Sequence, residues 1–172
     1  MNILDFIFSL LVLLFLLRFL LQAANADFYN PLSQAVVKAS DFICKPLRYA
    51  IPIFRNFDFA SLFVAWAISV AARAVLRPEL LDVVGLLLLG GLVYMLQVLT
   101  NFFMFAIFIL VLASFLAQGT YNPVLTLFNQ LLEPIVGPIR RVLPTFGPID
   151  FSPMVVLIII FLVQDMLRRF AY

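Results

Sequence analysis

The chain has 172 residues, of which 65% are hydrophobic and only 12% are charged, whereas a soluble domain has about 45–50% apolar and roughly 25% charged residues. A soluble domain of this length cannot bury such an excess, so the composition indicates a membrane protein. Eleven Lys and Arg residues against nine Asp and Glu residues give a net charge of +2. This balance excludes a strongly basic nucleic-acid-binding protein, and we expect no direct contact with nucleic acid.

Several kinds of catalytic and metal site are excluded by residues that the chain lacks. It has no His and a single Cys, Cys44, so a His-based catalytic triad, a His-ligated haem, an intrachain disulfide and a thiolate zinc site cannot form. Cys44 is therefore interpreted as a small buried residue. Because no converging nucleophile and base can be named, we expect no enzymatic activity, no catalytic residue, no cofactor and no metal.

Four segments are long and apolar enough to cross a bilayer, whose core of about 30 Å needs roughly 20 helical residues. The second and fourth segments each follow an aspartate, Asp58 and Asp150, whose carboxylate can accept hydrogen bonds from the first free N–H groups of a helix. The first segment is interpreted as a retained span rather than a signal peptide, because no Lys or Arg precedes its apolar run. The four predicted spans are Ile3–Leu21, Phe59–Leu76, about Val93–Gln118, and Phe151–Leu167.

The third region allows two alternatives. No residue from Val83 to Leu132 is charged, and an unbroken helix over Leu80–Gln118 would be about 58 Å long, almost twice the thickness of the bilayer core. Either the segment Leu80–Leu92 lies at the interface or in the bundle before a single crossing, or the chain turns near Thr100-Asn101 and crosses twice. The second alternative gives five spans.

An internal repeat favours the four-span alternative. A shift of 92 residues places Tyr29-Asn30-Pro31 on Tyr121-Asn122-Pro123 and gives ten identities in 33 positions, where roughly two or three are expected by chance. The same shift relates the first span to the third and the second to the fourth. We therefore predict an all-α polytopic membrane protein made of two tandem repeats, residues 1–77 and 95–172, joined by an apolar segment, residues 78–94.

The connector between the two spans of each repeat shows the spacing of an amphipathic helix. Pro46 and Pro138 fall inside the pattern, so each connector is predicted to form two helical pieces that bend there and end before Pro52 or Pro144. The connectors are expected to pack on the membrane surface or on the spans, and the alternative is a pore-lining or re-entrant element in Glu133–Pro153. The predicted apolar stripes are Leu32, Val36, Ala39, Ile43, Leu47 and Ala50, and in the second copy Val124, Phe128, Leu131, Ile135, Ile139 and Val142.

Three ionisable residues lie close to span interiors, where a charge is costly. Arg18 and Arg73 lie near span ends, and we expect their long side chains to reach the membrane surface. The 92-residue shift places Arg73 opposite Asp165, so a pair between these two residues inside the membrane is a further hypothesis. Small residues crowd the second span, Phe59–Leu76, which predicts that it packs centrally while the fourth faces more lipid.

With four spans, the two connectors share one side of the membrane. Seven basic residues lie on that side and four on the other, which favours cytoplasmic connectors. The seven are Arg18, Lys38, Lys45, Arg48, Arg55, Arg140 and Arg141, and the four are Arg73, Arg77, Arg168 and Arg169.

The connectors and the starts of the spans after them resemble the YggT family of small bacterial membrane proteins. The resemblance covers nearly the whole chain and is carried by the stretch from Glu133-Pro134 through Gly147-Pro148 to Ser152-Pro153, and the first copy departs from it because Tyr49 replaces the second Arg. The residues that match the family pattern are Asn30, Pro31, Pro46, Arg48, Pro52, Asp58, Asn122, Pro123, Pro138, Arg140, Arg141, Pro144, Asp150, Ser152 and Pro153.

The resemblance implies a location rather than a reaction. It implies a bacterial inner-membrane protein linked to osmotic-stress tolerance, with plastid relatives linked to nucleoid organisation and cytochrome assembly. Two functions follow as expectations. The favoured one is a non-enzymatic structural, assembly or stress-tolerance factor acting through its amphipathic connectors. The alternative is an ion-conducting or transport component, because transporters place sites at repeat interfaces. The expected partners are the lipid bilayer and either other inner-membrane proteins or further copies of the chain.

Overall fold

The chain is described by a computed structural model that covers residues 2–116, 122–143 and 150–170. These residues form helices and no strand apart from one isolated bridge between Phe54 and Phe57, which confirms the predicted all-α class. The elements are α1 (Ile3–Ala23), α2 (Pro31–Leu47), α3 (Phe59–Leu76), the short 3-10 helix η1 (Pro78–Asp82), α4 (Val84–Leu116), α5 (Pro123–Val142) and α6 (Ser152–Arg169).

Among the described residues, three helices are long and apolar enough to cross a membrane: α1, α3 and the part Val84–Ala113 of α4. Helix α6 has the same 18-residue length as α3, but its last two turns carry Asp165, Arg168 and Arg169. The predicted fourth span therefore has a more polar end than the other three helices.

Helix α4 is continuous for 33 residues, about 50 Å at 1.5 Å per residue, so the chain does not turn at Thr100-Asn101. The Thr100 hydroxyl donates to the carbonyl oxygen of Leu96, 3.0 Å away, one turn earlier. This bond satisfies the polar group inside the helix without breaking it. The alternative of a second crossing within this region is thus wrong, and the predicted end of this span at Gln118 lies outside the described residues.

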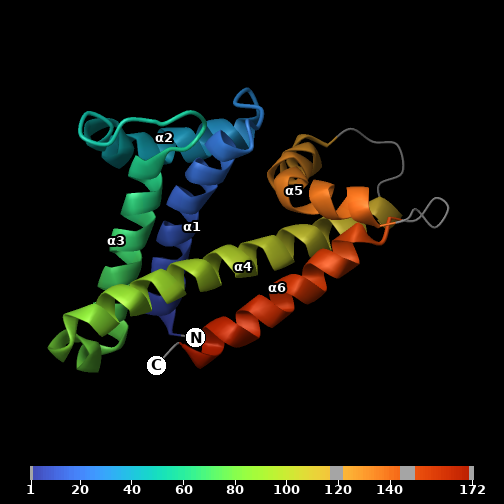
Figure 1. The fold of residues 1–172 in the computed structure, drawn as a ribbon. Helices are drawn as coiled ribbons and strands as arrows, with labels where there is room; N and C mark the ends of the chain where they lie inside the picture. Colours follow the sequence, from blue (N-terminus) through green and yellow to red (C-terminus); the bar gives the residue numbers. More distant parts are fainter. Residues whose placement is uncertain (1, 117–121, 144–149, 171–172) are drawn as a thin grey trace.

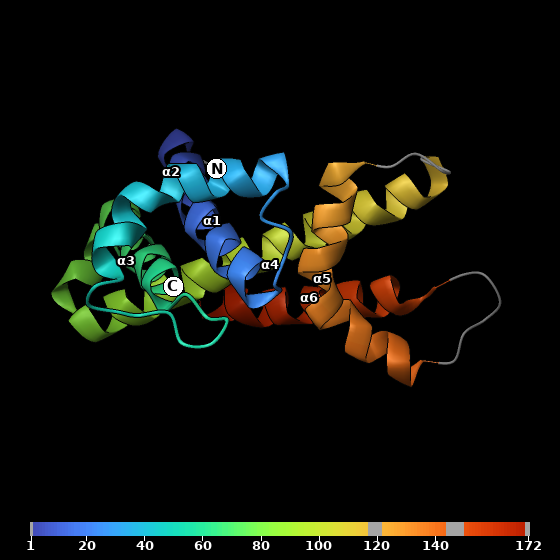
Figure 2. The ribbon, with the colours of Figure 1, turned by 90° about the horizontal axis from the view of Figure 1, so that it is seen from above.

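The helices form two antiparallel pairs that are inclined to each other. Figure 1 shows α1 beside α3, and α4 running obliquely past them with α6 alongside. Helix α2 lies across the ends of α1 and α3, and α5 lies over the far part of α4 and α6, so both connectors occupy the same end of the molecule (Figures 1 and 2). The two chain termini lie at the opposite end.

The core consists of two apolar clusters that meet within α4. Tyr94, Met95 and Val98 of α4 pack with α1, α2 and α3. Its buried residues Phe102, Phe103, Ala106 and Ile107 pack instead with α5, α6 and the end of α1. The switch falls between Val98 and Phe102, around the polar pair Thr100-Asn101. Helix α3 buries mostly small residues and more of them than α6 does, which confirms the prediction from its composition.

Helices α2, α3, α5 and α6 begin within one residue of the predicted positions, whereas α4 begins at Val84, before the predicted start of the third span near Val93. Asn30 and Asn122 cap α2 and α5 by accepting hydrogen bonds from the N–H groups of Leu32 and Val124, at 3.0 and 2.9 Å. Pro31 and Pro123 occupy the first helical positions, where a missing N–H costs nothing. Asp58 and Asp150 likewise accept bonds from the first backbone N–H groups of α3 and α6.

The connectors differ from the prediction in two respects. Helix α2 ends at Leu47, directly after Pro46, and forms no second helical piece, whereas α5 runs through Pro134 and Pro138 to Val142 and changes direction along its course (Figure 2). Proline removes one backbone hydrogen bond, and a long helix absorbs that loss by bending.

The buried face of α2 is also rotated from the predicted apolar stripe. Its fully buried residues are Ser33, Ser40 and Cys44, while Leu32 and Ile43 are each 41% exposed. The reason is the polar cluster beneath α2 described below. Helix α5 does bury an apolar face, which includes Leu131 of the predicted stripe.

Gly91 sets the distance between α3 and α4. A methyl group at this position would lie 2.4 Å from the Cγ2 atom of Val70 and 2.9 Å from its backbone. We expect Gly91→Ala to lower the free energy of unfolding by about 1–2 kcal/mol, because overpacking costs about 1–3 kcal/mol and better helix propensity returns up to about 1 kcal/mol. Thermal unfolding in detergent measures the change.

Gly85→Ala is the matched control in the same helix, because no atom lies within 4 Å of an added methyl group there. It is expected to leave stability unchanged or to raise it by up to about 1 kcal/mol. Equal effects of the two substitutions would show that α3 and α4 are not held at this contact.

Candidate functional site: two ionic clusters at the connector end

Five charged residues of the first half form what we call the first ionic cluster: Arg18, Asp41, Lys45, Arg48 and Asp58. Arg18 on α1 contacts Asp41 on α2 at 2.6 Å and Asp58 before α3 at 3.4 Å. Arg48 also donates to Asp58, and Lys45 lies 3.0 Å from Asp41. The cluster therefore joins both spans of the first half to their connector.

Arg18 is buried, with 5% of its surface exposed, and Asp58 is fully buried. The expectation that the Arg18 side chain reaches the membrane surface is thus wrong. Helix α2 covers the end of α1, and its Ser40 hydroxyl and Val37 carbonyl accept hydrogen bonds from Arg18 at 2.8 and 2.9 Å. A buried charge persists only when its hydrogen bonds and its counter-charges are supplied in this way.

Three residues of the second half form the second ionic cluster: Glu133, Arg140 and Asp150. Arg140 on α5 lies 2.8 Å from Asp150, just before α6, and 3.3 Å from Glu133. These three side chains are between 41% and 59% exposed. This cluster also joins a connector to the start of the following helix, but its side chains are exposed.

The 92-residue shift superimposes the two clusters in sequence. Asp41, Arg48 and Asp58 correspond to Glu133, Arg140 and Asp150, so a carboxylate, an arginine and a second carboxylate recur. The buried cation does not recur, because Leu110 and Leu132 stand at the positions of Arg18 and Ser40. The arginine and aspartate of the family pattern are therefore paired in both copies. Only the first pair also contacts a third helix, through Arg18 on α1.

The ionic partners shift the pKa values of the groups in α2. Burial alone would raise the pKa of Asp41, but the hydrogen bond from Lys45 and the charges of Arg18 and Lys45 lower it. Burial raises the pKa of the Cys44 thiol, which is fully buried beside the cluster. Cys44 therefore remains a neutral thiol at physiological pH, in agreement with its interpretation as a packing residue.

Asp150 makes the second cluster sensitive to acid. Hydrogen bonds from Ser152, and then Arg140, lower the pKa of Asp150 below its ordinary value of 3.8 despite partial burial. A carboxyl group with a lowered folded-state pKa stabilises the fold fully above its unfolded pKa, and this contribution disappears as the pH falls through the folded value. We expect the junction of α5 and α6 to be unchanged from pH 7 to about pH 5 and to loosen below about pH 4.

Hydrogen exchange of the Ser152 amide as a function of pH, corrected for intrinsic exchange, measures this change. Asp150→Asn, which keeps the cap but cannot titrate, is expected to lack the acid step. Loosening that already begins near neutral pH, or an identical acid step in the variant, would contradict the assignment to Asp150.

The starts of the two connectors touch each other. The Asn30 side chain donates to the carbonyl oxygen of Pro123 at 2.7 Å, and the Asp27 N–H donates to the side-chain oxygen of Gln130 at 2.9 Å. These bonds span 93 and 103 residues of sequence. Asn30 of the family pattern thus both caps its own helix and fixes the two halves to each other.

Arg73 and Asp165, the hypothetical intramembrane pair, have other partners. The Arg73 guanidinium lies 5.3 Å from the centre of the Tyr94 ring, and Asp165 pairs with Arg169 at 2.8 Å, one turn away on α6. Within the described residues no ion pair joins the two.

The other residues of the family pattern lie around the same end. Pro52 and Arg141 are exposed, Ser152 is buried, and Pro153 follows it in the first turn of α6. Pro144 lies outside the described residues. The sequence analysis did not identify Asp41, Ser40 and Lys45 as site residues. Asp41 could have been found, because the 92-residue shift places it on Glu133, which is also acidic; a comparison that counts only identical residues leaves this match out.

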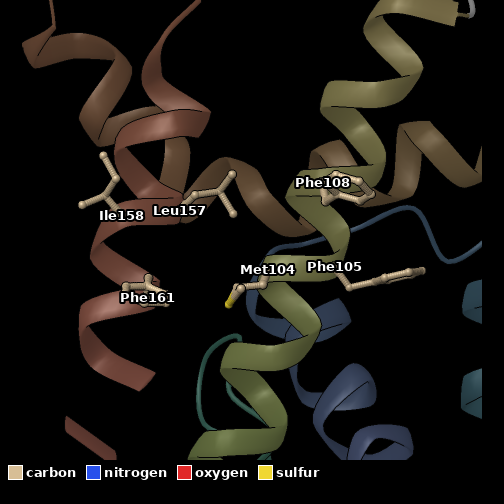
Figure 3. A pocket seen from close by; sticks show the side chains of 6 residues that line it. All are labelled: Met104, Phe105, Phe108, Leu157, Ile158 and Phe161. Atoms are coloured by element: carbon tan, nitrogen blue, oxygen red, sulfur yellow. The ribbon is translucent and has the colours of Figure 1, made fainter. Parts of the chain in front are cut away.

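Two grooves between the helices are apolar. One groove of about 540 Å³ lies between α4 and α6 and is lined only by Met104, Phe105, Phe108, Leu157, Ile158 and Phe161 (Figure 3). A second of about 600 Å³, between α3 and α4, is lined by residues that include Phe63, Trp66 and Leu89. Within the described ranges no group of three or more His, Cys, Asp or Glu side chains could hold a metal ion.

Comparison with known proteins identifies the family. A sequence model of the CCB3/YggT family matches residues 1–78 and 89–171. An uncharacterised protein of Pseudomonas aeruginosa is 40% identical over 150 residues, which cover 85% of this chain and 76% of that protein. The uncharacterised protein YggT of Escherichia coli is 35% identical over 168 residues, which cover 95% of this chain and 88% of the relative. No solved structure matches. Since the family model covers both halves and these relatives span most of the chain, the chain belongs to the CCB3/YggT family.

Proposed function

We propose that this protein is a non-enzymatic, multi-pass protein of the bacterial inner membrane that acts as a structural or assembly factor and supports tolerance of osmotic stress. In this proposal α1, α3, α4 and α6 cross the membrane, and the connectors α2 and α5 lie at its cytoplasmic surface. The ionic clusters hold the connectors on the spans, so that the connectors present a fixed surface to lipid headgroups or to a neighbouring membrane protein.

The duplicated organisation supports the four-span arrangement. The 92-residue shift carries α1, α2 and α3 onto the last part of α4, α5 and α6, and the family model matches once in each half. We therefore propose units at residues 1–77 and 95–172 with residues 78–94 between them. All seven basic residues counted for the connector side belong to the end formed by α2 and α5, which favours cytoplasmic connectors.

The observation that carries the functional proposal is the exposure of large aromatic side chains on the first connector. Phe42 on α2 is 89% exposed, and Tyr49, two residues after the end of α2, is 94% exposed. Lys38 and Lys45 lie on α2 as well. Aromatic rings and basic side chains together are typical of segments that lie in the membrane interface, and exposed rings of this size also mark protein contacts.

Of the two neighbouring arginines at the end of α5, only Arg141 is proposed to bind an external anion or partner. Arg140 is engaged by Glu133 and Asp150, whereas Arg141 is exposed and available to bind an anion or a partner. The apolar lining of both grooves argues against ion conduction through a single chain, because an ion path needs polar groups.

Complementation of a bacterial strain that lacks its own copy of the gene tests the proposal. The double variant Phe42→Ala/Tyr49→Ala is expected to lose growth at high osmolarity while its level in the membrane stays normal. The matched control Phe105→Ala/Phe161→Ala removes two exposed rings from the spans and is expected to complement fully. Complementation by the connector variant would contradict the proposal, and potassium flux through liposomes containing the wild-type chain would favour the transport alternative.

A further inference from the structure

Arg73 is the second deeply buried arginine of the molecule and lies at the opposite end from the ionic clusters. It is located one turn before the end of α3 and is 7% exposed, almost as buried as Arg18 at 5%. Figure 1 shows that α3 ends, and α4 begins, at the end of the molecule where the termini lie.

The two buried arginines differ in their partners. Arg18 contacts two carboxylates, a hydroxyl and a backbone carbonyl. Arg73 donates one long hydrogen bond, from Nε to the carbonyl oxygen of Gly90 at 3.4 Å, and lies over the face of Tyr94. Within the described residues no carboxylate forms an ion pair with it. The Asp5 carboxylate acts on Arg73 electrostatically but forms no ion pair with it. A buried charge without a contacting carboxylate is costly, so a bound anion would stabilise it.

Three of the acidic side chains at this end have other partners. The Asp5 carboxylate accepts a hydrogen bond from the Tyr94 hydroxyl at 2.9 Å, Glu79 lies 3.4 Å from Arg77, and Asp165 pairs with Arg169. Asp82 in η1 is exposed, and no ion pair joins it to Arg73.

The unpaired part of Arg73 is accessible. Among the described residues, the buried side-chain nitrogen and oxygen atoms without a hydrogen bond are Ser33 Oγ, Asp41 Oδ1 and Arg48 Nε. The two terminal nitrogens of Arg73 have no hydrogen bond and are not among these fully buried atoms, so each keeps some exposed surface although the residue as a whole is 7% exposed. They are the pair of donors with which a guanidinium group binds two oxygens of a phosphate.

The position of Arg73 is fixed by close helix packing. Gly91 lets α4 approach the backbone of Val70, and this approach places Gly90 and Tyr94 against Arg73. Arg77 follows directly after α3 and lies 3.4 Å from Glu79, so the charge left without an ion pair at this end of the helix is that of Arg73.

We propose that Arg73 binds the phosphate of an anionic phospholipid in the leaflet on the side of the termini. A charge one turn from the end of a span lies at the depth of the lipid phosphates. The Arg73 charge, which no carboxylate pairs within the described residues, favours a lipid with net negative charge over a zwitterionic lipid, whose own cation would be repelled. This site lies away from the connectors and does not depend on the function proposed for them.

Native mass spectrometry of the detergent-solubilised protein, titrated with phosphatidylglycerol or phosphatidylcholine, tests the proposal. The wild-type chain is expected to bind one phosphatidylglycerol at least about tenfold more tightly than phosphatidylcholine, and Arg73→Gln is expected to lose this preference, because a charged hydrogen-bonding contact accounts for about that factor. Arg168→Gln is the control, since Arg168 is an exposed cation at the same end, and it should bind as the wild type does.

Arg73→Lys keeps the charge without the paired donors and is expected to bind with intermediate affinity. If Arg73→Gln does not fold, the lipid preference of the wild type and the Arg73→Lys result decide the question. Equal binding of the two lipids by the wild type, or undiminished binding by Arg73→Gln, would overturn the proposal. Stabilisation by inorganic phosphate equal to that by phosphatidylglycerol would also overturn it in favour of a soluble anion.

Discussion

Arg18→Leu is expected to lower the free energy of unfolding by about 3–5 kcal/mol, the usual cost of removing one member of a buried ion pair. Arg18 lies between Asp41 and Asp58 and is the cation of the first ionic cluster that is itself deeply buried. Its loss leaves the fully buried Asp58 carboxylate with Arg48 alone and releases the Ser40 hydroxyl from its contact with α1. Equilibrium unfolding in mixed micelles measures the change.

The second half of the chain supplies the control for this prediction. Leu110 occupies the equivalent position, so leucine is compatible with the repeat when the carboxylates are exposed. Leu110→Ala at this equivalent position removes apolar volume without removing a charge. Its effect on the free energy of unfolding gives the size of a pure packing loss, with which the loss in Arg18→Leu can be compared. If Arg18→Leu cost less than about 1 kcal/mol, the first cluster would be a solvated surface network rather than a buried one.

Asp58→Asn is expected to have the second large effect, about 3 kcal/mol. Asn caps a helix as well as Asp does, so the bond to the Ser61 N–H can remain while the charge is lost. Arg18 and Arg48 then lose their shared carboxylate, and Arg18 has no route to water because α2 covers it. The same unfolding measurement applies, with helix content as a check that α3 is intact.

Asp150→Asn is the matched control at the corresponding position of the second half. Its ion pair with Arg140 is exposed, and exposed pairs contribute less than about 1 kcal/mol. Equal costs at Asp58 and Asp150 would contradict the distinction between the two clusters. A double variant Arg18→Leu/Asp58→Asn is expected to cost less than the sum of the single changes, because the two residues share one contact.

The difference between the clusters bears on how the two connectors behave. In the first half the connector is fixed by a buried cation, whereas in the second half it is held by exposed ion pairs and by the apolar face of α5. Salt screens exposed pairs far more than buried ones. We therefore expect rising ionic strength to loosen the second connector more than the first.

Much of the local structure followed from the sequence. The Asn-Pro pairs at residues 30–31 and 122–123 predicted the starts of α2 and α5, because an Asn cap followed by Pro is a strong local signal. The aspartates before α3 and α6 were recognised for the same reason. The repeat shift also pointed to the matching order of helices, since α1, α2 and α3 fall on elements of the second half.

The prediction failed where a side chain depends on a distant element. Arg18 was expected at the membrane surface because its position near a span end allows that, and only the course of α2 across α1 and α3 shows that it is covered. The apolar stripe of α2 was assigned from periodicity, but Ser40, whose hydroxyl accepts a hydrogen bond from Arg18, faces inward together with Ser33 and Cys44 instead. Contacts of this kind join residues 22 and 40 positions apart, beyond the reach of a local pattern.

By itself the sequence determined that this protein resides in a membrane, that it is helical, where the capped helices α2, α3, α5 and α6 begin, and that its two halves resemble each other in sequence. Composition is a sum over residues, and helix caps depend only on neighbouring residues. The tertiary structure alone decided which charges pair. It gave Arg18 two carboxylates and left Arg73 with a ring and a carbonyl group, although both are buried arginines near span ends. The physical reason is that the energy of a buried charge depends on the donors and acceptors that the folded chain brings to it.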